Sequence, residues 1–452
     1  MIERTCIVRL RILDPDPLGK PMPPRAIHEG TPMTPMPAST DGNAAQVQRT
    51  TPAGPLAGLL VADFSRVLAG PLATMTLADL GARVIKVERP GNGDDTRSWG
   101  PPFSPTGATY FDSANRNKES VCLDLSEPGD RQLARELALR ADVLVENFKP
   151  GGMDKLGLGY AELFEGNPGL IYASISGFGS AGGATLMGYD FIVQAMGGLM
   201  SITGEEHGGP TKAGVALVDV LTAKDTTIGV LAALAARATS GLGAHLELNL
   251  LSSLQGALAN QGQAFLGSGT VPQRMGNAHP SIVPYQLLQC ADAPLAVACG
   301  NDGQFAKLTQ VLGIAGLAQD PRFATNNARV EHRTKLVPLL EDALSSSSAL
   351  IWQDKLIDAG VPAGHVASIE EGLEYAESLG LEPTIEVCNV AGDPVGRQIR
   401  HPITWIPAIP APAAAPPSLG EHSGAVRAWL ADGADDGHAS QWKGADKKPT
   451  KH

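Results

Sequence analysis

Short apolar segments alternate with helical patterns for more than 100 residues, and this alternation constrains the fold more than any other feature of the chain. Residues 58–64 and 82–88 have the length and apolar content of strands, and residues 71–80 between them carry apolar side chains at helical spacing. The pattern continues with strands at 120–125, 141–146 and 170–176 and helices at 129–139 and 160–167. We therefore predict an α/β fold with a doubly wound parallel sheet.

Ligands of doubly wound sheets bind at the carboxyl ends of the strands. The loops that begin at Ser65, Arg89, Asn147 and Gly177 each follow an expected strand directly. The functional site is therefore expected where these four loops meet.

The chain divides into a folded body and two ends. Ten prolines are scattered through residues 1–55, which we interpret as a disordered N-terminal extension, or as upstream sequence if the start is Met33 or Met36. A large domain is expected at 56–265, with a strong, buried helix over 222–238. It is followed by a linker at 266–283, a smaller α+β domain at 284–375, a return segment at 376–432 that packs on the large domain, and a flexible tail at 433–452.

The overall charge and the cysteines exclude several classes of protein. The 35 Lys and Arg against 47 Asp and Glu give a net charge of −12, which argues against a nucleic-acid partner. Five cysteines without a CxxC spacing indicate neither a disulfide framework nor a zinc site. Residues 228–236 are too short an apolar run to cross a membrane, and no signal peptide is recognised. We expect a cytoplasmic protein without a metal site.

Asp219 is the residue that most suggests chemistry. It follows the apolar run 215–218 and precedes the expected buried helix, so its carboxylate is expected at a helix N-terminus, where the dipole and free N–H groups keep it ionised. Such a carboxylate can act as a nucleophile, and it can equally be a simple N-cap. The residues alone leave both interpretations open.

Other patterns are weaker. Residues 177–182 match GxGxxG after a strand, but no helix is expected to follow, which favours a glycine-rich loop over a dinucleotide site. Glu88 ends a strand like a ribose-binding carboxylate, although a solvated side chain is the simpler expectation. Ser174 and Ser176 lack the GxSxG elbow of serine hydrolases.

Four segments carry a set of spaced motifs: 62–71 (ADFSRVLAGP), 79–94 (DLGARVIKVERPGNGD), 145–151 (VENFKPG) and 419–422 (LGEH). Together they resemble class III CoA-transferases, the CaiB/BaiF family, over roughly residues 56–430. The resemblance implies a Rossmann-like large domain, a smaller domain and an interlocked, ring-shaped homodimer. It also implies that Asp219 is the nucleophile, which takes the acyl group of an acyl-CoA as a mixed anhydride and then carries CoA as an aspartyl thioester to a free acid.

The same resemblance implies a set of CoA contacts by position. No permanently bound cofactor is expected, and the CoA thioester is a substrate. Two of the matching positions, Leu68 and Met187, depart from the formyl-CoA branch, and residues 275–280 are expected to take the place of that branch's glycine-rich loop. The matching residues are Leu68, Ala69, Arg89, Leu123, Asp124, Leu125, Ser126, Asn147, Phe148, Lys149, Lys155, Met187, Gly188, Tyr189 and Asp190.

Two alternatives use the same fold. A 2-methylacyl-CoA racemase would need the family's histidine, where this chain has Tyr189, a poor base at neutral pH; the other alternative is a CoA-binding protein without activity. For the transferase, succinyl-CoA as donor and a dicarboxylate acceptor are a family-based guess. Trp99 is a candidate for the acyl pocket or a packed loop anchor, and the candidates for the acceptor's carboxylate clamp, each with a solvated alternative, are Arg66, Arg97, Arg116 and Arg274.

Overall fold

The computed structural model describes residues 54–409 and 413–432. The expected N-terminal extension, apart from its last two residues, and the expected tail lie outside the described residues. A parallel six-stranded sheet forms the centre of the large domain. Its strands follow one another across the sheet as β5 (Lys118–Cys122), β2 (Arg83–Glu88), β1 (Leu60–Asp63), β6 (Val143–Glu146), β7 (Ile171–Ser176) and β8 (Ala244–Asn249). The predicted α/β class with a parallel sheet is confirmed.

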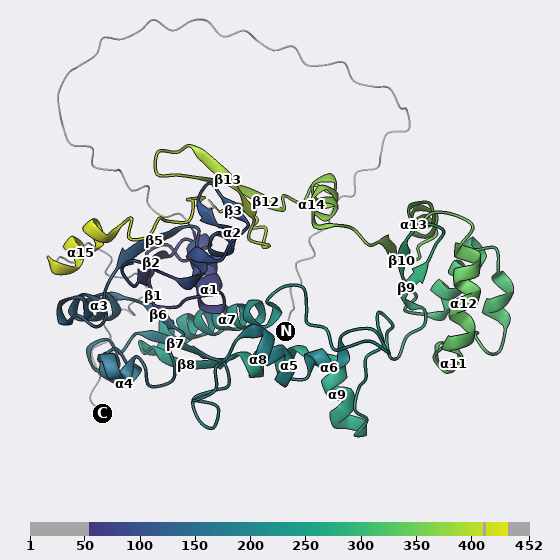
Figure 1. The fold of residues 1–452 in the computed structure, drawn as a ribbon, viewed down its shortest axis with the longest axis horizontal. Coiled ribbons are helices and arrows are strands. Elements are labelled where there is room, and N and C mark those ends of the chain that lie inside the picture. Colours follow the sequence, from purple (N-terminus) through teal and green to yellow (C-terminus); the bar gives the residue numbers. More distant parts are fainter. Residues whose placement is uncertain (1–53, 410–412, 433–452) are drawn as a thin grey trace, which may run out of the picture. The chain divides into compact units, whose positions relative to one another are not determined.

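Both faces of this sheet are buried by helices (Figure 1). Because side chains alternate across a strand, Val61 packs on one face with α1 (Ala69–Asp79), α7 (Leu217–Ser240) and α8 (Leu250–Ala257). Ala62 packs on the other face with α3 (Pro128–Arg140), α4 (Tyr160–Gly166) and α15 (Ser423–Ala431). This arrangement leaves the carboxyl ends of the strands as the edge where loops from several βα units meet.

The expected buried helix is α7, and the prediction was wrong for one of its faces. Val218, Thr222, Thr226 and Val230 are buried at helical spacing, but Ile228 is 64% exposed. Its C-terminus ends in the left-handed residue Gly241.

Short elements follow the strand ends of the large domain. They are β3 (Phe103–Ser104), β4 (Gly107–Ala108), α2 (Thr109–Asp112), α5 (Asp190–Met196), α6 (Leu199–Ile202) and α9 (Ala259–Ser268), with 3-10 turns at Asp95–Ser98 and Asp154–Leu156.

The smaller unit has its own core around Leu288, Phe305 and Trp352. It contains the antiparallel pair β9 (Tyr285–Gln289) and β10 (Pro294–Ala298), which β11 (Ala363–His365) extends. Its helices are α10 (Asp302–Val311), α11 (Asn326–Glu331), α12 (Arg333–Leu344) and α13 (Ala349–Asp358), with a 3-10 turn at Ala315–Gln319. The domain boundaries that the sequence indicates stay a prediction.

The later part of the chain forms α14 (Ile369–Ser378) and the antiparallel pair β12 (Thr384–Cys388) and β13 (Pro394–Ile399). It then reaches the edge of the large sheet, where the His422 nitrogen donates to the Ser120 carbonyl and Arg427 pairs with Asp130. None of the helices in the described part of the chain is long and apolar enough to cross a membrane.

Candidate functional site

A cavity of about 330 Å³ lies at the carboxyl ends of β1, β2 and β5. It gathers six of the residues predicted to contact CoA, although they come from three separate loops. Polar side chains of β2 and of the loops after β1 and β2, among them Arg66, Lys86 and Asp94, complete the wall. The six predicted residues that line it are Arg89, Leu123, Asp124, Leu125, Ser126 and Phe148.

Two exposed guanidinium groups border this cavity. Arg89, 53% exposed along its side chain, pairs with Asp95, and Arg66 pairs with the other oxygen of the same carboxylate at 3.1 Å. Asp124 forms a local turn instead, because its carboxylate accepts from the nitrogen and hydroxyl of Ser126, which lowers the pKa of Asp124. The guanidinium groups fit phosphate oxygens by charge and geometry.

Three predicted CoA contacts have side chains that serve the protein itself: those of Leu68 and Ala69 pack in the interior, and that of Asn147 binds the main chain of Arg66. Leu68 and Ala69 are buried at the N-terminus of α1, so only their main chain can face a ligand. The Asn147 amide accepts from the Arg66 nitrogen at 3.0 Å and donates to the Arg66 carbonyl at 2.7 Å. Asn147 therefore fixes the loop after β1.

A second cavity, of about 750 Å³, lies beyond Phe148 at the ends of β6, β7 and β8 and takes in Lys149. Its buried Glu146 has a pKa raised by burial to about 7, although the Ser174 hydroxyl and the Phe148 amide oppose the rise. The Ser174 hydroxyl also lies 2.9 Å from His245 Nε2. Lys155, after this region, is exposed.

Met187, Gly188 and Tyr189 line neither cavity. Met187 and Tyr189 are 68% and 58% exposed. Gly188 packs against Gly177 so closely that a Cβ on either residue would overlap the other's Cα. The GxGxxG segment therefore begins with a backbone contact that only glycine allows, which supports the interpretation as a glycine-rich loop.

Asp219 lies in the first turn of α7 with only 9% of the residue exposed. Its expected place at the helix N-terminus agrees with the structure, but the N-cap alternative was wrong, because the N-cap is Ala216 and the carboxylate that accepts from the first helical nitrogens is Asp190. Asp190 Oδ1 accepts from the nitrogens of Val218 at 2.7 Å and Asp219 at 3.2 Å. Burial and then the charge of Asp190 raise the pKa of Asp219 to about 7. The helix N-terminus was expected to favour the ionised form of Asp219, and this expectation was wrong.

Two residues that sequence reasoning missed, Gln194 and Tyr110, lie with Asp190 and Asp219. Gln194 is fully buried and donates to Asp190 Oδ2 at 2.6 Å, while its carbonyl accepts from the Ala213 nitrogen at 2.9 Å. Burial raises the pKa of Tyr110 to about 12, and the charges of Asp219 and Asp190 add to the rise. The spacing of Asp190 and Gln194, four residues apart on one helix face, was the available signal for Gln194; Tyr110 had none.

A family model described as CoA-transferase family III matches residues 56–423. The chain belongs to CoA-transferase family III. It is 44% identical to the succinate–glutarate CoA-transferase of Agrobacterium fabrum, over 83% of this chain and 96% of that protein. It is 42% identical to the acetyl-CoA:oxalate CoA-transferase of Acetobacter aceti, over 76% of this chain and 90% of that protein. The crystal structure of a CaiB/BaiF family protein from Brucella suis has a TM-score of 0.75 and 44% identity, over 84% of this chain and 100% of the other.

This family III transferase uses two of the four arginines proposed as a carboxylate clamp to neutralise buried acids. Arg97 holds Glu88 through two bonds of 2.7 Å and stacks on Phe111. Arg116 holds Asp79 in the same bidentate way at 2.9 and 2.6 Å. The solvated alternative was wrong for Arg97, Arg116 and also Glu88, which is buried.

Arg66 and Arg274 remain candidates for the clamp. Arg66 is exposed beside the smaller cavity. Arg274 Nε is buried without a hydrogen-bond partner among the described residues, and its Cδ would touch a Cβ on Gly204. The segment 275–280 meets the same loop, where the Gly276 nitrogen donates to the Gly204 carbonyl at 3.0 Å.

Trp99 packs edge-on against Tyr110, with ring centroids 5.0 Å apart, and so anchors the loop after β2. Tyr110 is the residue whose pKa the charges of Asp219 and Asp190 help to raise. Among residues 54–409 and 413–432, no cluster of three or more His, Cys, Asp or Glu side chains is arranged to hold a metal ion.

Proposed function

We propose that this CoA-transferase moves CoA from a dicarboxylic acyl-CoA, such as succinyl-CoA, to a free dicarboxylic acid, with Asp219 as the covalent nucleophile. The observation that carries the proposal is the place of Asp219: a buried carboxylate with a raised pKa, in a chain of this family. Poor solvation and raised basicity both make a carboxylate a better nucleophile. The names of the relatives, which contain succinate, glutarate and oxalate, support the dicarboxylic substrates.

The proposed reaction keeps the acyl group activated in each step, first as an anhydride and then as a thioester. The Asp219 carboxylate attacks the thioester carbonyl, the C–S bond breaks, and a mixed anhydride and CoA thiolate form. The thiolate attacks the aspartyl carbonyl of the anhydride, which releases the donor acid as a carboxylate and leaves an aspartyl-CoA thioester. The acceptor carboxylate attacks this thioester and expels the thiolate again. The thiolate then takes the acceptor's acyl group, and Asp219 returns as a free carboxylate without net proton transfer.

We further propose that CoA lies along the strand ends, with its phosphates near Arg89 and Lys149. The support is the gathering of Arg89, residues 123–126 and Phe148 around one cavity and of Lys149 beside the next. Arginine provides fixed paired donors for phosphate oxygens, and lysine adds a positive charge.

The enzyme is proposed to act as the interlocked homodimer that the family resemblance implies. Exposed apolar side chains on two helices of the large domain support an interface: Ile228 on α7 and Phe265 and Leu266 on α9. Light scattering during size exclusion tests this, because a monomeric mass would contradict it.

The test of function is an exchange assay with succinyl-CoA and glutarate in deuterated water. We expect glutaryl-CoA from the native enzyme, and at least about 1,000-fold less from Asp219→Asn. Asp225→Asn is the matched control, because it is the same change on the exposed part of the same helix. Unchanged exchange by Asp219→Asn would refute the nucleophile, and α-deuteration of an acyl-CoA without exchange would indicate a racemase.

A further inference from the structure

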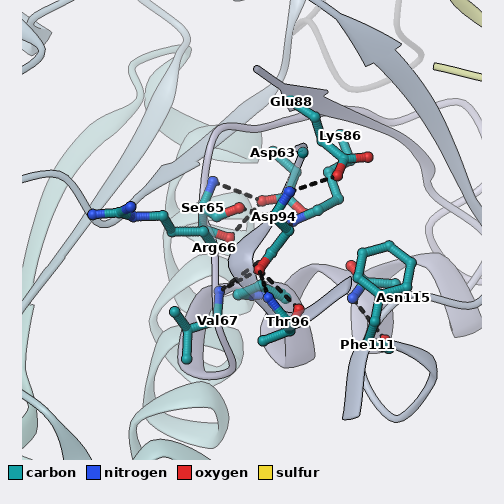
Figure 2. Close-up of polar contacts among 12 residues, drawn as sticks. Asp63, Ser65, Arg66, Val67, Lys86, Glu88, Asp94, Thr96, Phe111 and Asn115 are labelled. Atoms are coloured by element: carbon teal, nitrogen blue, oxygen red, sulfur yellow. Dashed lines mark hydrogen bonds and ion pairs between the residues drawn. The ribbon is translucent and has the colours of Figure 1, made fainter. Parts of the chain in front are cut away.

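A cluster of buried charges lies beneath the loop after β1 (Figure 2). We call it the buried ion cluster, and it consists of Asp63, Lys86, Glu88, Asp94 and Lys118. Lys118 pairs with Asp63 at 3.0 Å, and Lys86 pairs with Asp94 at 3.0 Å. Charges so deeply buried are expensive unless they are paired, and a pair of apolar residues would often serve stability as well. Their presence here calls for a role beyond stability.

Asp63 is ionised within this cluster. Burial alone would raise its pKa, but Lys118, Lys86 and two hydroxyl groups more than offset burial and hold the pKa of Asp63 at about 2. Asp63 also accepts from the Ser65 nitrogen at 3.0 Å and from the Thr74 hydroxyl at 2.7 Å. The second residue after the strand and the second turn of α1 are thereby tied to one carboxylate.

Val67 has a backbone conformation that its side chain disfavours. Its φ is +71°, in the left-handed region, which is uncommon for any residue with a Cβ and most unfavourable for a β-branched one. A strained conformation of this kind is disfavoured roughly 5- to 100-fold relative to an ordinary one, so surrounding contacts must stabilise it. Val67 directly precedes the residues that begin α1, Leu68 and Ala69.

The buried ion cluster supplies these contacts. The Val67 nitrogen donates to both oxygens of Asp94, at 3.2 and 3.3 Å, and Figure 2 shows that carboxylate directed at Val67 and Thr96. Lys86 Nζ donates to the Ser65 carbonyl at 2.8 Å, two residues earlier. The strained turn is therefore held at its amide by Asp94 and at its start by Lys86, and these two groups are themselves an ion pair.

Asp94 also joins this turn to the loop after β2. It accepts from the Thr96 nitrogen and hydroxyl at 3.0 and 2.8 Å, as the N-cap of the 3-10 turn that carries Asp95. Its own nitrogen donates to Glu88 at 3.0 Å. Both of its oxygens are thus occupied by the protein, and the two loops that it joins carry Arg66 and Arg89, which border the smaller cavity.

We propose that Asp94 is a positioning residue for CoA binding: with Lys86 it holds Val67 in its left-handed conformation, and so sets the turn from which α1 and one wall of the smaller cavity begin. The inference rests on the proposed function in that it takes this cavity as the CoA site. Asp94 acts through the backbone of Val67, because both of its carboxylate oxygens are engaged by Val67, Thr96 and Lys86. A simple N-cap of a 3-10 turn would need neither the bond to Val67 nor the buried lysine.

Asp94→Ala tests the proposal through binding. We expect the dissociation constant for CoA, measured by calorimetry, and the KM for the acyl-CoA to rise about 10-fold, with a smaller change in kcat and none in the KM for the acceptor acid. Asp142→Asn is the control, because Asp142 is a similarly buried carboxylate that pairs with Arg237 and lies at the amino ends of β1 and β6, far from the carboxyl ends. This variant should lose stability but keep the affinity for CoA.

A second substitution separates positioning from general damage. Glycine adopts positive φ without the penalty of a Cβ, so Val67→Gly in the Asp94→Ala background should restore at least about threefold of the lost affinity. Unchanged affinity in Asp94→Ala, or no restoration by Val67→Gly, would overturn the proposal. CoA binding without any transferase activity in the native enzyme would refute the proposed function alone, and the affinities of the variants would still decide the role of Asp94; a native enzyme that binds no CoA would refute both.

Discussion

The carboxylate of Asp190 accepts a hydrogen bond from the main-chain nitrogen of Asp219, 3.2 Å away, and a shorter one from Val218. Two acidic side chains therefore lie at the N-terminus of α7, and Asp190 is the one that accepts hydrogen bonds from the main-chain nitrogens of the helix. Asp190 is stabilised there, while burial and the charge of Asp190 raise the pKa of Asp219 to about 7.

This relationship predicts the pH dependence of the reaction. Attack requires ionised Asp219, so the rate should rise with pH through about 7. Asp190→Asn keeps an oxygen to accept from the helix but removes the charge, which should lower the pKa of Asp219 and move the acidic limb of kcat/KM to lower pH.

Glu146, which also has a pKa of about 7, could produce a similar limb, and the Asp190→Asn shift distinguishes the two groups. Asp225→Asn should leave the limb in place, because Asp190 is the only charge in the described part of the chain that shifts the pKa of Asp219. A limb that does not move in Asp190→Asn would contradict the assignment to Asp219.

The same pKa predicts how Asp219→Asn affects stability. As pH rises from about 4 to about 7, Asp219 ionises in the unfolded chain but stays protonated in the folded one, so the native enzyme loses stability over this range. The full loss is present above pH 7 and amounts to at most about 4 kcal/mol for a shift of about three pKa units. Urea unfolding should show Asp219→Asn more stable than the native enzyme at pH 8, with the gain vanishing near pH 4. An equal gain in the free energy of unfolding at both pH values would contradict a raised pKa of Asp219.

The sequence predicted the strands that are buried on both faces better than it predicted the edge. Strands β1, β6 and β7 are largely apolar runs with clear ends, and β2 and the edge strand β5 were also expected, although both carry charged residues. Strand β8 was missed, because its sequence AHLELN alternates polar and apolar residues and half of it faces solvent at the sheet edge. A strand buried on one face carries a weaker signal than one buried on two.

The site was predictable in its parts but not in its charge pairing. Asp219 stood out by its position before a long helix, yet its pKa depends on Asp190, 29 residues earlier, which only the fold brings close. Glu88 was expected to be solvated, although it belongs, with Lys86, to a central strand. A charged residue within a strand that is covered on both faces must have a buried partner, and this rule was the signal that could have revealed the ion cluster.

Gly188→Ala should reduce catalysis without affecting the nucleophile itself. A Cβ at this position would overlap Gly177, so the backbone before α5 must move and carry Asp190, two residues later, away from α7. We expect about 10- to 100-fold lower kcat. Gly182→Ala is the control in the same loop, because its Cβ would meet nothing within 4 Å. Equal kcat in the two variants would show that Asp190 does not depend on this glycine contact.

Two arginines should behave in opposite ways. Arg116→Met leaves Asp79 buried without its partner, and should lower the free energy of unfolding by about 3 to 5 kcal/mol while the KM for either substrate stays unchanged in the folded enzyme. Arg89→Ala removes an exposed ion pair with Asp95 and one hydrogen bond to the Gly93 carbonyl, so stability should change by at most about 2 kcal/mol while the KM for the acyl-CoA rises. Denaturation and initial-rate kinetics on the two variants check both expectations; a raised acceptor KM in Arg116→Met would make Arg116 the clamp.

Direct detection of the covalent intermediate tests the central claim. The enzyme is mixed with succinyl-CoA, treated with hydroxylamine and digested, and the peptide that contains Asp219 is analysed by mass spectrometry, with the Asp219→Asn variant treated in parallel. We expect a hydroxamate on Asp219 of the native enzyme and none on the variant. Turnover of succinyl-CoA with glutarate while Asp219 stays unmodified would show that CoA is transferred without an aspartyl intermediate.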